Sequence, residues 1–328
     1  MIHLEDTMQF DLKNLSREEA LVILNLPNES LPELLTAVYE IRKTHKGNAV
    51  NVQLLTNARS GNCTQNCAYC AQSHDSGADI DRYESISRAQ LLTNGAVISE
   101  QNLARHCIGF SGMSFTDQEI TRFAYDVREL KKEHNTPICC SIGFLTREQA
   151  QQLKAAGVDR INHNLNTSRR FYPQICSTHT YEARIANIKM LQGIGFEICC
   201  GGIIGLGETN EDVVDMLFEI KAIRPQAVPV NFLIPVKGTA LEQMDTSRLT
   251  PEFCLKVLCL ARIVRPNADI RAAAGRELYL KGREKEMFYV VDSIFASGYL
   301  TEKGQSLVDT IQMIREAGFT PCVEGAVG

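Results

Sequence analysis

Cys63-Thr-Gln-Asn-Cys67-Ala-Tyr-Cys70 places three cysteines within eight residues, and the rest of the chain is best understood from this stretch. Thiolates are soft ligands that suit iron–sulfur clusters and zinc. A loop with this spacing can bring three sulfurs to one small inorganic group. A closed structural site normally takes four protein ligands, so three ligands leave one coordination position open, and an open position allows chemistry.

Length and composition favour a single large domain. The chain has 328 residues, 44% of them hydrophobic, which suits one α/β barrel. The formal net charge is -5 and no basic stripe is present, so we expect no nucleic-acid partner. We see no apolar run long enough to span a membrane and no signal peptide at the N-terminus. These features predict a cytoplasmic protein.

Twelve cysteines are many for such a protein, and their positions decide how they are interpreted. In a reducing compartment they are more often metal ligands, catalytic groups or small buried side chains than disulfides. Outside the first loop the chain has Cys107, Cys139, Cys140, Cys176, Cys199, Cys200, Cys254, Cys259 and Cys322. We interpret Cys254, Cys259 and Cys322 as packing or surface residues. Cys176 is interpreted in the same way, although it follows a predicted strand and stays open to a role at the strand ends.

Hydrophobic periodicity predicts a helical N-terminus followed by alternating strands and helices. Residues 16–46 predict two helices, the first capped by Ser16. The predicted strands are 50–55, 104–110, 137–142, 158–165, 196–204, 227–234, 268–273 and 290–296. The predicted helices between and after them are 87–102, 116–133, 146–156, 179–192, 210–222, 250–264 and 303–317, with Gly157 and Gly193 as C-terminal signals.

This alternation predicts an α/β fold, a parallel (β/α)₈ barrel of the TIM type with an N-terminal helical cap. We expect one domain over residues 1–328, with the cap at 1–47, the barrel at 48–318 and a C-terminal tail at 319–328. Functional residues of such barrels gather at the C-terminal ends of the strands. The cysteine loop follows the first predicted strand and therefore belongs to that end.

The cysteine loop resembles the signature of the radical S-adenosylmethionine enzymes. The resemblance implies that Cys63, Cys67 and Cys70 bind three irons of a [4Fe-4S] cluster. The fourth iron would then bind S-adenosylmethionine, with Tyr69 near the adenine. The loop identifies the superfamily without identifying the reaction.

Further motifs resemble the biotin synthase family within that superfamily. They are Cys70-Ala-Gln-Ser73, Asn162-His-Asn-Leu-Asn-Thr-Ser168, Gly201-Gly-Ile-Ile-Gly-Leu-Gly-Glu208, Val228-Pro-Val-Asn231, Lys237-Gly-Thr239 and Arg271-Ala-Ala-Ala-Gly-Arg-Glu277. The resemblance implies sulfur insertion into dethiobiotin to form biotin, with an auxiliary [2Fe-2S] cluster as the sulfur source. It further implies a flavodoxin- or ferredoxin-type electron donor and a homodimer.

The resemblance also assigns individual residues. The auxiliary cluster would be bound by Cys107, Cys139, Cys199 and Arg271. Asn162 and Asn231 would contact the ureido ring of the substrate. Residues for S-adenosylmethionine, besides Tyr69, would be Asn164 and Asn166 at the ribose together with Gly201, Gly202 and Ile203.

The residues themselves support the second cluster. Cys107, Cys139, Cys199 and Arg271 fall on four different predicted strands and can meet only inside a closed barrel. A buried guanidinium needs a partner. Arginine is a weak ligand for iron, and a cluster bound partly by it should be labile, as a sulfide donor must be.

Several positions depart from the family pattern. Asn166 stands where many relatives have Asp, and Phe110 is bulky for a site near the methionine carboxylate. Cys140 and Cys200 follow cluster cysteines directly, and strand alternation predicts that they face the helices. As spare thiolates they would instead allow an auxiliary cluster larger than [2Fe-2S], and we keep both alternatives.

Other interpretations of the whole chain remain open. The loop cysteines with His74 would form a structural zinc site. The barrel would also suit another radical reaction, such as that of a hydrogenase maturase or a methylornithine synthase. A zinc or iron–sulfur protein without turnover is the third alternative.

Overall fold

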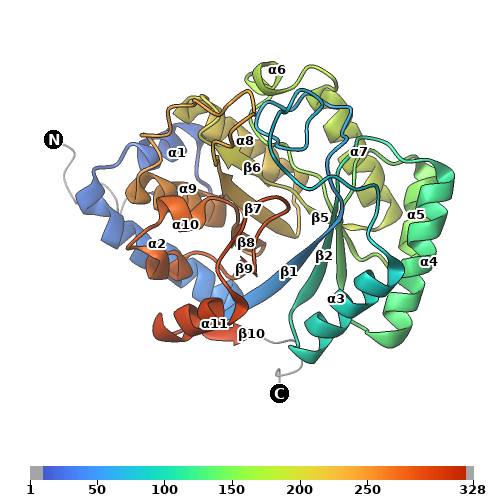
Figure 1. The fold of residues 1–328 in the computed structure, drawn as a ribbon. Helices are drawn as coiled ribbons and strands as arrows, with labels where there is room; N and C mark the ends of the chain where they lie inside the picture. The colour runs from blue at the N-terminus through green and yellow to red at the C-terminus, as the bar shows by residue number, and fades with distance from the viewer. Residues whose placement is uncertain (1–9, 323–328) are drawn as a thin grey trace.

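A computed structural model describes residues 10–322, and it has the predicted barrel at its centre (Figure 1). All paired strands run parallel, and pairing of the first strand with β9 closes the sheet into an eight-stranded barrel. The barrel strands are β1 (Ala49–Arg59), β2 (Arg105–Phe110), β3 (Ile138–Ser141), β4 (Arg160–Asn162), β5 (Glu197–Cys199) continued by β6 (Gly202–Ile204), β7 (Ala227–Phe232), β8 (Asp269–Ala272) and β9 (Ser293–Ala296). The predicted fold class is confirmed.

Helices form the outer layer of the barrel (Figure 1). They are α3 (Arg88–Glu100), α4 (Asp117–Glu133), α5 (Arg147–Ala156), α6 (Tyr172–Ile175), α7 (Tyr181–Ile194), α8 (Asn210–Ile223), α9 (Pro251–Val264), α10 (Arg276–Tyr279), the 3₁₀ helix η3 (Glu284–Tyr289) and α11 (Leu307–Glu316). Capping boxes at Thr116, Thr146 and Thr209 begin three of them. In residues 10–322, no helix combines the length and apolar character that crossing a membrane requires.

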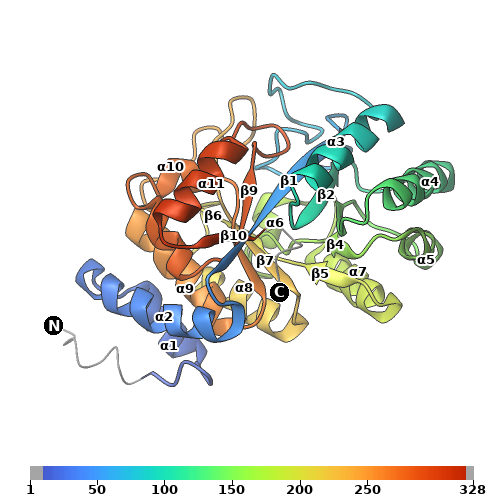
Figure 2. The same ribbon diagram turned by 90° about the horizontal axis from the view of Figure 1, so that it is seen from below.

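Two N-terminal helices lie against the outer helices α8 and α9 (Figure 2). They are α1 (Arg17–Leu24) and α2 (Leu31–Lys46), joined by the 3₁₀ turn η2 (Asn28–Ser30). Ser16 caps α1 through a reciprocal bond with Glu19, as the sequence predicts. Gly47 ends α2 with a φ of 58°.

Three local predictions were wrong. The fifth predicted strand is interrupted at Cys200 and Gly201, because the neighbouring strand carries Pro229, which has no N–H to donate. Helix α7 runs through Gly193 and ends at Gly195, which has the left-handed φ of 94°. The predicted tail contains a further strand, β10 (Thr320–Cys322), which pairs with the start of β1. Residues 323–328 of that tail lie outside the described residues.

Ion pairs fill the N-terminal end of the barrel. Arg160 bonds Glu197 at 2.8 Å and Asp269 at 3.0 Å. Lys46 reaches Asp269 at 2.7 Å, and Arg105 reaches Glu197 at 3.4 Å. Burial opposes ionisation of Asp269, but Arg160 and Lys46 outweigh it and lower its pKa to about 2. This end is therefore closed, whereas the opposite end contains the pockets described below.

Candidate active site

The cysteine loop connects β1 to α3 and lies at the C-terminal end of the barrel. Cys63, Cys67 and Cys70 are part-buried and line one pocket together with Tyr69. The backbone of Cys70 donates to Cys67 at 3.0 Å, and that of Ala68 donates to the last residue of α6 at 2.9 Å. The loop is thus folded back on itself, and one pocket faces all three cysteines.

Burial, with a smaller contribution from nearby Cys63, raises the pKa of the Cys70 thiol to about 11. A raised pKa keeps a loop cysteine in its thiol form while no metal is bound. A metal ion or cluster replaces the protons of the thiols that bind it, so the raised pKa does not prevent binding. The donors suit iron: they are thiols, they share a pocket, and three of them leave a coordination position open.

A second group of thiols lies inside the barrel. Cys107, Cys139 and Cys199 are buried and form a cluster that is separate from the main hydrophobic core. The register aligns Cys107 with Cys139 across β2 and β3. Arg271 on β8 approaches from the far side, with its Nη1 4.0 Å from Cys199 Sγ. The structure therefore brings together the four residues that the sequence grouped.

Two polar residues that the sequence analysis missed hold Arg271 in place. Gln53 Oε1 accepts from Arg271 Nη2 at 2.8 Å and from the Cys107 thiol at 3.2 Å. Ser293 Oγ accepts from Arg271 Nε at 3.0 Å and from Gln53 Nε2 at 3.1 Å. The guanidinium also lies over the Phe295 ring, 4.6 Å from its centroid. The alternation of β1 and β9 would place Gln53 and Ser293 on an inner face, but only the register shows that they meet.

Cys140 and Cys200 do not join the interior group. Both are fully buried in the hydrophobic core between barrel and helices. Burial raises the pKa of Cys200 to about 12, as expected for a thiol packed in an apolar core. Strand alternation accounts for their position, since each follows an inward-facing cysteine.

The asparagines at the end of β4 link the two thiol groups. Asn162 Nδ2 lies 3.3 Å from Cys199 Sγ and 3.0 Å from Asn164 Oδ1. The same Asn164 oxygen accepts from the backbone of Gly201 at 3.0 Å. Asn166 has a φ of 71° and donates to the Tyr69 hydroxyl at 2.7 Å. The structure thus makes neighbours of Asn166 and Tyr69, which the sequence analysis assigned to the same cofactor, while contact of either residue with that cofactor stays a prediction.

Asn231 projects from β7 with both ends of its amide engaged. It donates to the carbonyl of Gly202 at 3.1 Å and accepts from the backbone of Ala274 at 3.2 Å. The side chain lines two adjoining pockets, one above the interior cysteines and one at the loop. Asn162, Asn164, Tyr69 and Ile203 line both pockets as well. The two thiol groups therefore face one continuous site.

Gly201 and Gly202 have a packing role. A Cβ on Gly201 would stand 1.8 Å from the Pro229 carbonyl oxygen, and one on Gly202 would stand 2.1 Å from the Met216 sulfur. The missing side chains thus let this strand approach β7 and α8. Packing by itself therefore requires glycine at both positions, and their predicted contact with S-adenosylmethionine stays a prediction.

Phe110, which the sequence analysis noted as bulky for this site, packs against α4. Its ring packs edge-on against Phe123 at 4.7 Å and against Phe115 at 5.8 Å between centroids. It still lines the edge of the loop pocket. The aromatic cluster therefore accommodates the bulk of this side chain.

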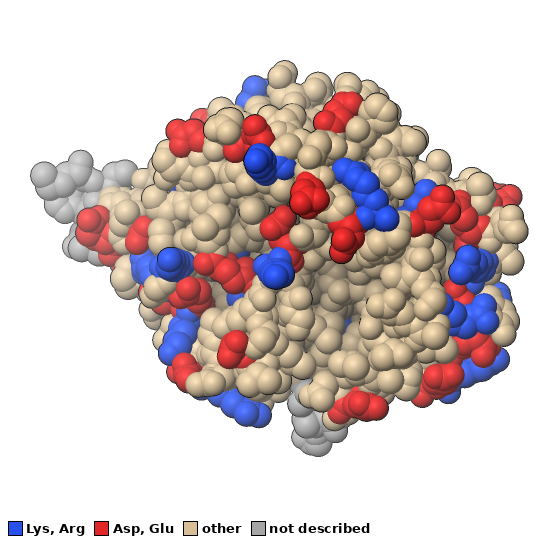
Figure 3. All heavy atoms as spheres, in the orientation of Figure 1, with Lys and Arg blue, Asp and Glu red and all other residues tan. Residues whose placement is uncertain are grey.

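Charged groups are mixed on the surface near the site. Figure 3 shows lysines and arginines interspersed with aspartates and glutamates over the face seen in Figure 1.

Comparison with known proteins agrees with this geometry. Residues 58–220 match the Radical SAM superfamily, and residues 229–320 match the Biotin and Thiamin Synthesis associated domain. Two solved structures share the fold. A methylornithine synthase superposes with a TM-score of 0.84 at 18% identity, covering 98% of this chain and 97% of that one. The FeFe-hydrogenase maturase HydG from Carboxydothermus hydrogenoformans superposes with a TM-score of 0.83 at 16% identity, covering 98% of this chain and 80% of that one. At these identities the likeness concerns the fold alone.

Fold, cysteine loop and family match define the class: a barrel enzyme of the radical S-adenosylmethionine superfamily. Curated relatives identify the family more narrowly. The biotin synthase of Halalkalibacterium halodurans is 42% identical over 94% of this chain and 92% of its own, and that of Rhodopirellula baltica is 39% identical over 93% and 84%. The chain belongs to the biotin synthase family.

Proposed function

We propose that this enzyme inserts sulfur into dethiobiotin to form biotin, with one iron–sulfur cluster at the cysteine loop and a second inside the barrel. The convergence of Cys107, Cys139, Cys199 and Arg271 beneath the pocket is the observation that carries the proposal. The near full-length relatives named biotin synthase support the same reaction. When bound, the loop cluster with S-adenosylmethionine supplies a carbon-centred radical, and the interior cluster supplies sulfide.

The loop would bind its cluster through Cys63, Cys67 and Cys70, and the open coordination position would face the shared pocket. Tyr69 and Asn166 are bonded to each other beside it. Their hydroxyl and amide groups would position the nucleoside part of S-adenosylmethionine. Asn164 and Ile203 line the same pocket and would complete this contact. Enclosure by the barrel would keep water from a reactive radical.

The interior group would bind the auxiliary cluster through three thiolates and the guanidinium of Arg271. These are four donors, as many as a [2Fe-2S] cluster takes from protein. Cys140 and Cys200 face the helices, so neither adds a thiolate from its present position. We therefore favour [2Fe-2S] over a larger cluster. Gln53 and Ser293 would aim Arg271 at the cluster through the bonds described above.

Asn162 and Asn231 would position the substrate between the two clusters. A side-chain amide both donates and accepts, which matches a ureido group. Both side chains line the pocket above the interior cysteines. Asn162 also contacts Cys199, so a substrate held by it would lie next to the proposed sulfur source.

The proposal also includes an electron donor, a homodimeric state and a cellular location. A flavodoxin- or ferredoxin-type protein would deliver electrons, and the active form would be a homodimer, as the family resemblance implies. The reducing cytoplasm is the proposed location, because it would keep the cysteine ligands as thiols. A single domain over residues 1–328 would contain the whole site, because the matched regions share one barrel.

Neighbouring cysteines allow a matched test of the function. We expect anaerobically reconstituted protein to form biotin from dethiobiotin and to release 5′-deoxyadenosine. Cys199→Ala should abolish biotin while S-adenosylmethionine cleavage continues, and Cys200→Ala on the other face should retain both. Equal loss in both variants, or no dethiobiotin-dependent product from the wild type, would argue against the proposal.

A further inference from the structure

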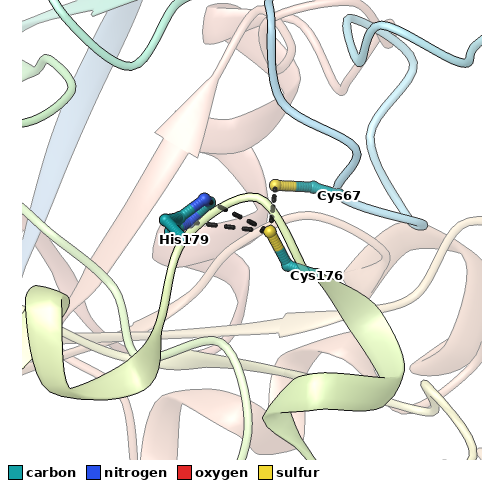
Figure 4. Close-up of side chains that lie close together, drawn as sticks. All are labelled: Cys67, Cys176 and His179. Atoms are coloured by element: carbon teal, nitrogen blue, oxygen red, sulfur yellow. Dashed lines mark hydrogen bonds between the residues drawn. The ribbon is translucent and has the colours of Figure 1, made fainter.

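Cys67 of the cysteine loop lies next to Cys176, in the connection between α6 and α7. Their sulfurs are 3.8 Å apart. His179 lies beside them, with Nδ1 3.2 Å and Nε2 3.8 Å from Cys176 Sγ. One ligand atom from each residue lies within 4.8 Å of the other two. Figure 4 shows the three side chains converging from the loop and from the connection.

These separations match the coordination of a single metal ion. Two thiolates on a tetrahedral zinc ion, each about 2.3 Å from the metal, stand about 3.8 Å apart. A thiolate and an imidazole nitrogen at zinc distances stand about 3.5 Å apart. The observed sulfur–sulfur distance of 3.8 Å fits the first value, and the distance of 3.8 Å from Cys176 Sγ to His179 Nε2 lies close to the second.

We propose that Cys67, Cys176 and His179 form a binding site for one Zn²⁺ ion in protein whose cysteine loop has not taken up a cluster. Two thiolates and one imidazole are a donor set that zinc favours. The two thiolate charges balance the charge of the ion. The part-buried cation Arg184 therefore faces a neutral centre instead of a second positive charge.

The surroundings of His179 already have the arrangement of a metal-binding histidine. Arg184 Nη2 donates to Nε2 at 2.7 Å, which assigns the ring proton to Nδ1. Nδ1 then donates to Gln65 Oε1 at 2.9 Å. Metal-bound histidines usually donate their other N–H to such an oxygen, which fixes the ring. Zinc would take Nε2 and displace one hydrogen bond of Arg184, which keeps Tyr172 at 2.5 Å and the Asn164 carbonyl at 3.1 Å.

The site differs from the zinc site that the sequence suggested. His74 was the expected fourth ligand beside the three loop cysteines. In the structure its side chain is 73% exposed and bonds its neighbour Asp75. Cys176 is 5% exposed and comes from another segment that packs on the loop. Zinc would thus take one cysteine from the loop and two ligands from outside it.

Sharing Cys67 has a consequence for cluster assembly, and this consequence rests on the proposed function. Cys67 cannot serve zinc and the loop cluster at once. Zinc at this site would therefore hold the loop without a cluster until the ion is removed. The ion site itself does not depend on the role of the loop in catalysis.

The test is a cobalt titration of cluster-free, fully reduced protein without oxygen. We expect one equivalent of Co²⁺ to give tetrahedral d–d bands with thiolate charge transfer, and one equivalent of Zn²⁺ to remove them. Cys176→Ser and His179→Gln should each weaken binding at least about a hundredfold, because ligand loss exceeds the 10–100-fold cost of losing an outer-shell partner. Circular dichroism checks that each variant is folded.

Three further variants separate this site from the loop. Cys63→Ser, Cys70→Ser and the distant Cys254→Ser should bind cobalt like the wild type. No tetrahedral signal in the wild type would overturn the proposal. So would binding that needs Cys63 and Cys70 but persists in both the Cys176 and the His179 variant.

Iron uptake tests the competition separately. Stoichiometric zinc should slow iron–sulfide reconstitution of the wild type and should not slow it in Cys176→Ser. If cobalt binds as predicted but zinc slows both proteins equally, the ion site stands and the competition is wrong. If cobalt binds and neither protein forms a cluster under any condition, it is the proposed function that fails.

Discussion

The loop thiols and the interior thiols of this enzyme are built in opposite ways. Cys63 and Cys70 belong to one short segment, are part-buried and line the outer pocket. Cys107 and Cys199 come from different strands, are buried, and meet through the closure of the barrel. A cluster held by a local loop can have one coordination position at which solvent and cofactor replace each other. A site assembled from strands encloses its cluster and controls what reaches it.

Removing one cysteine from each group should have the largest effect and should separate the two roles. We expect Cys70→Ala to abolish both S-adenosylmethionine cleavage and biotin formation, because the radical would be made at the loop. Cys139→Ala should abolish biotin formation and leave cleavage measurable. Product analysis for 5′-deoxyadenosine and biotin in the same reaction makes the comparison. Cleavage that survives in Cys70→Ala would remove the distinction between the groups.

Arg271 should have the next largest effect, confined to the interior group. Arg271→Met keeps the length of the side chain and loses the guanidinium, which leaves Gln53 Oε1 without its 2.8 Å donor. Because arginine is a weak ligand for iron, we expect biotin formation to fall only about 10–100-fold, the range of an outer-shell partner, with cleavage unchanged. Biotin formation should fall less in Gln53→Ala, because this change loosens Arg271 without removing it. An unchanged interior iron signal and rate in Arg271→Met would contradict this role.

Asn231 should affect substrate binding more than either cluster. Asn231→Ala removes the amide that would contact the ureido group, together with its bonds to the Gly202 carbonyl and the Ala274 N–H. A loss of about 1–3 kcal/mol is expected, which raises KM for dethiobiotin about tenfold or more. Steady-state kinetics should show the rise in KM, and the visible absorbance of the clusters should stay the same. A changed absorbance with unchanged KM would assign Asn231 to a cluster.

Cys140 and Cys200 should give the smallest effect, on stability alone. Each is fully buried between strands and helices, so replacement by Ala leaves a small cavity and costs about 1 kcal/mol. Thermal unfolding measures this cost, and Mössbauer spectra of the reconstituted variants should match the wild type. Altered spectra in either variant would show that a helix-facing thiol reaches the interior cluster.

The same contrast explains what the sequence could predict. Periodicity and capping residues predict the barrel, and the eight-residue spacing predicts the cysteine loop. The interior group depended on family resemblance, since its members are far apart in the chain. Gln53 and Ser293 were missed because their contacts with Arg271 depend on strand register. Contact between Cys67 and Cys176 was missed because it depends on how two loops pack, which no periodic pattern records.

Sulfur should come from the interior cysteine group, and this claim is central to the proposed function. The most direct test reconstitutes the wild type and Cys139→Ala with heavy-isotope sulfide, removes free sulfide and follows one turnover by mass spectrometry of biotin. We predict labelled biotin from the wild type and none from Cys139→Ala, although the loop cluster of that variant carries the same label. Unlabelled biotin from the wild type, or labelled biotin from Cys139→Ala, would contradict the claim.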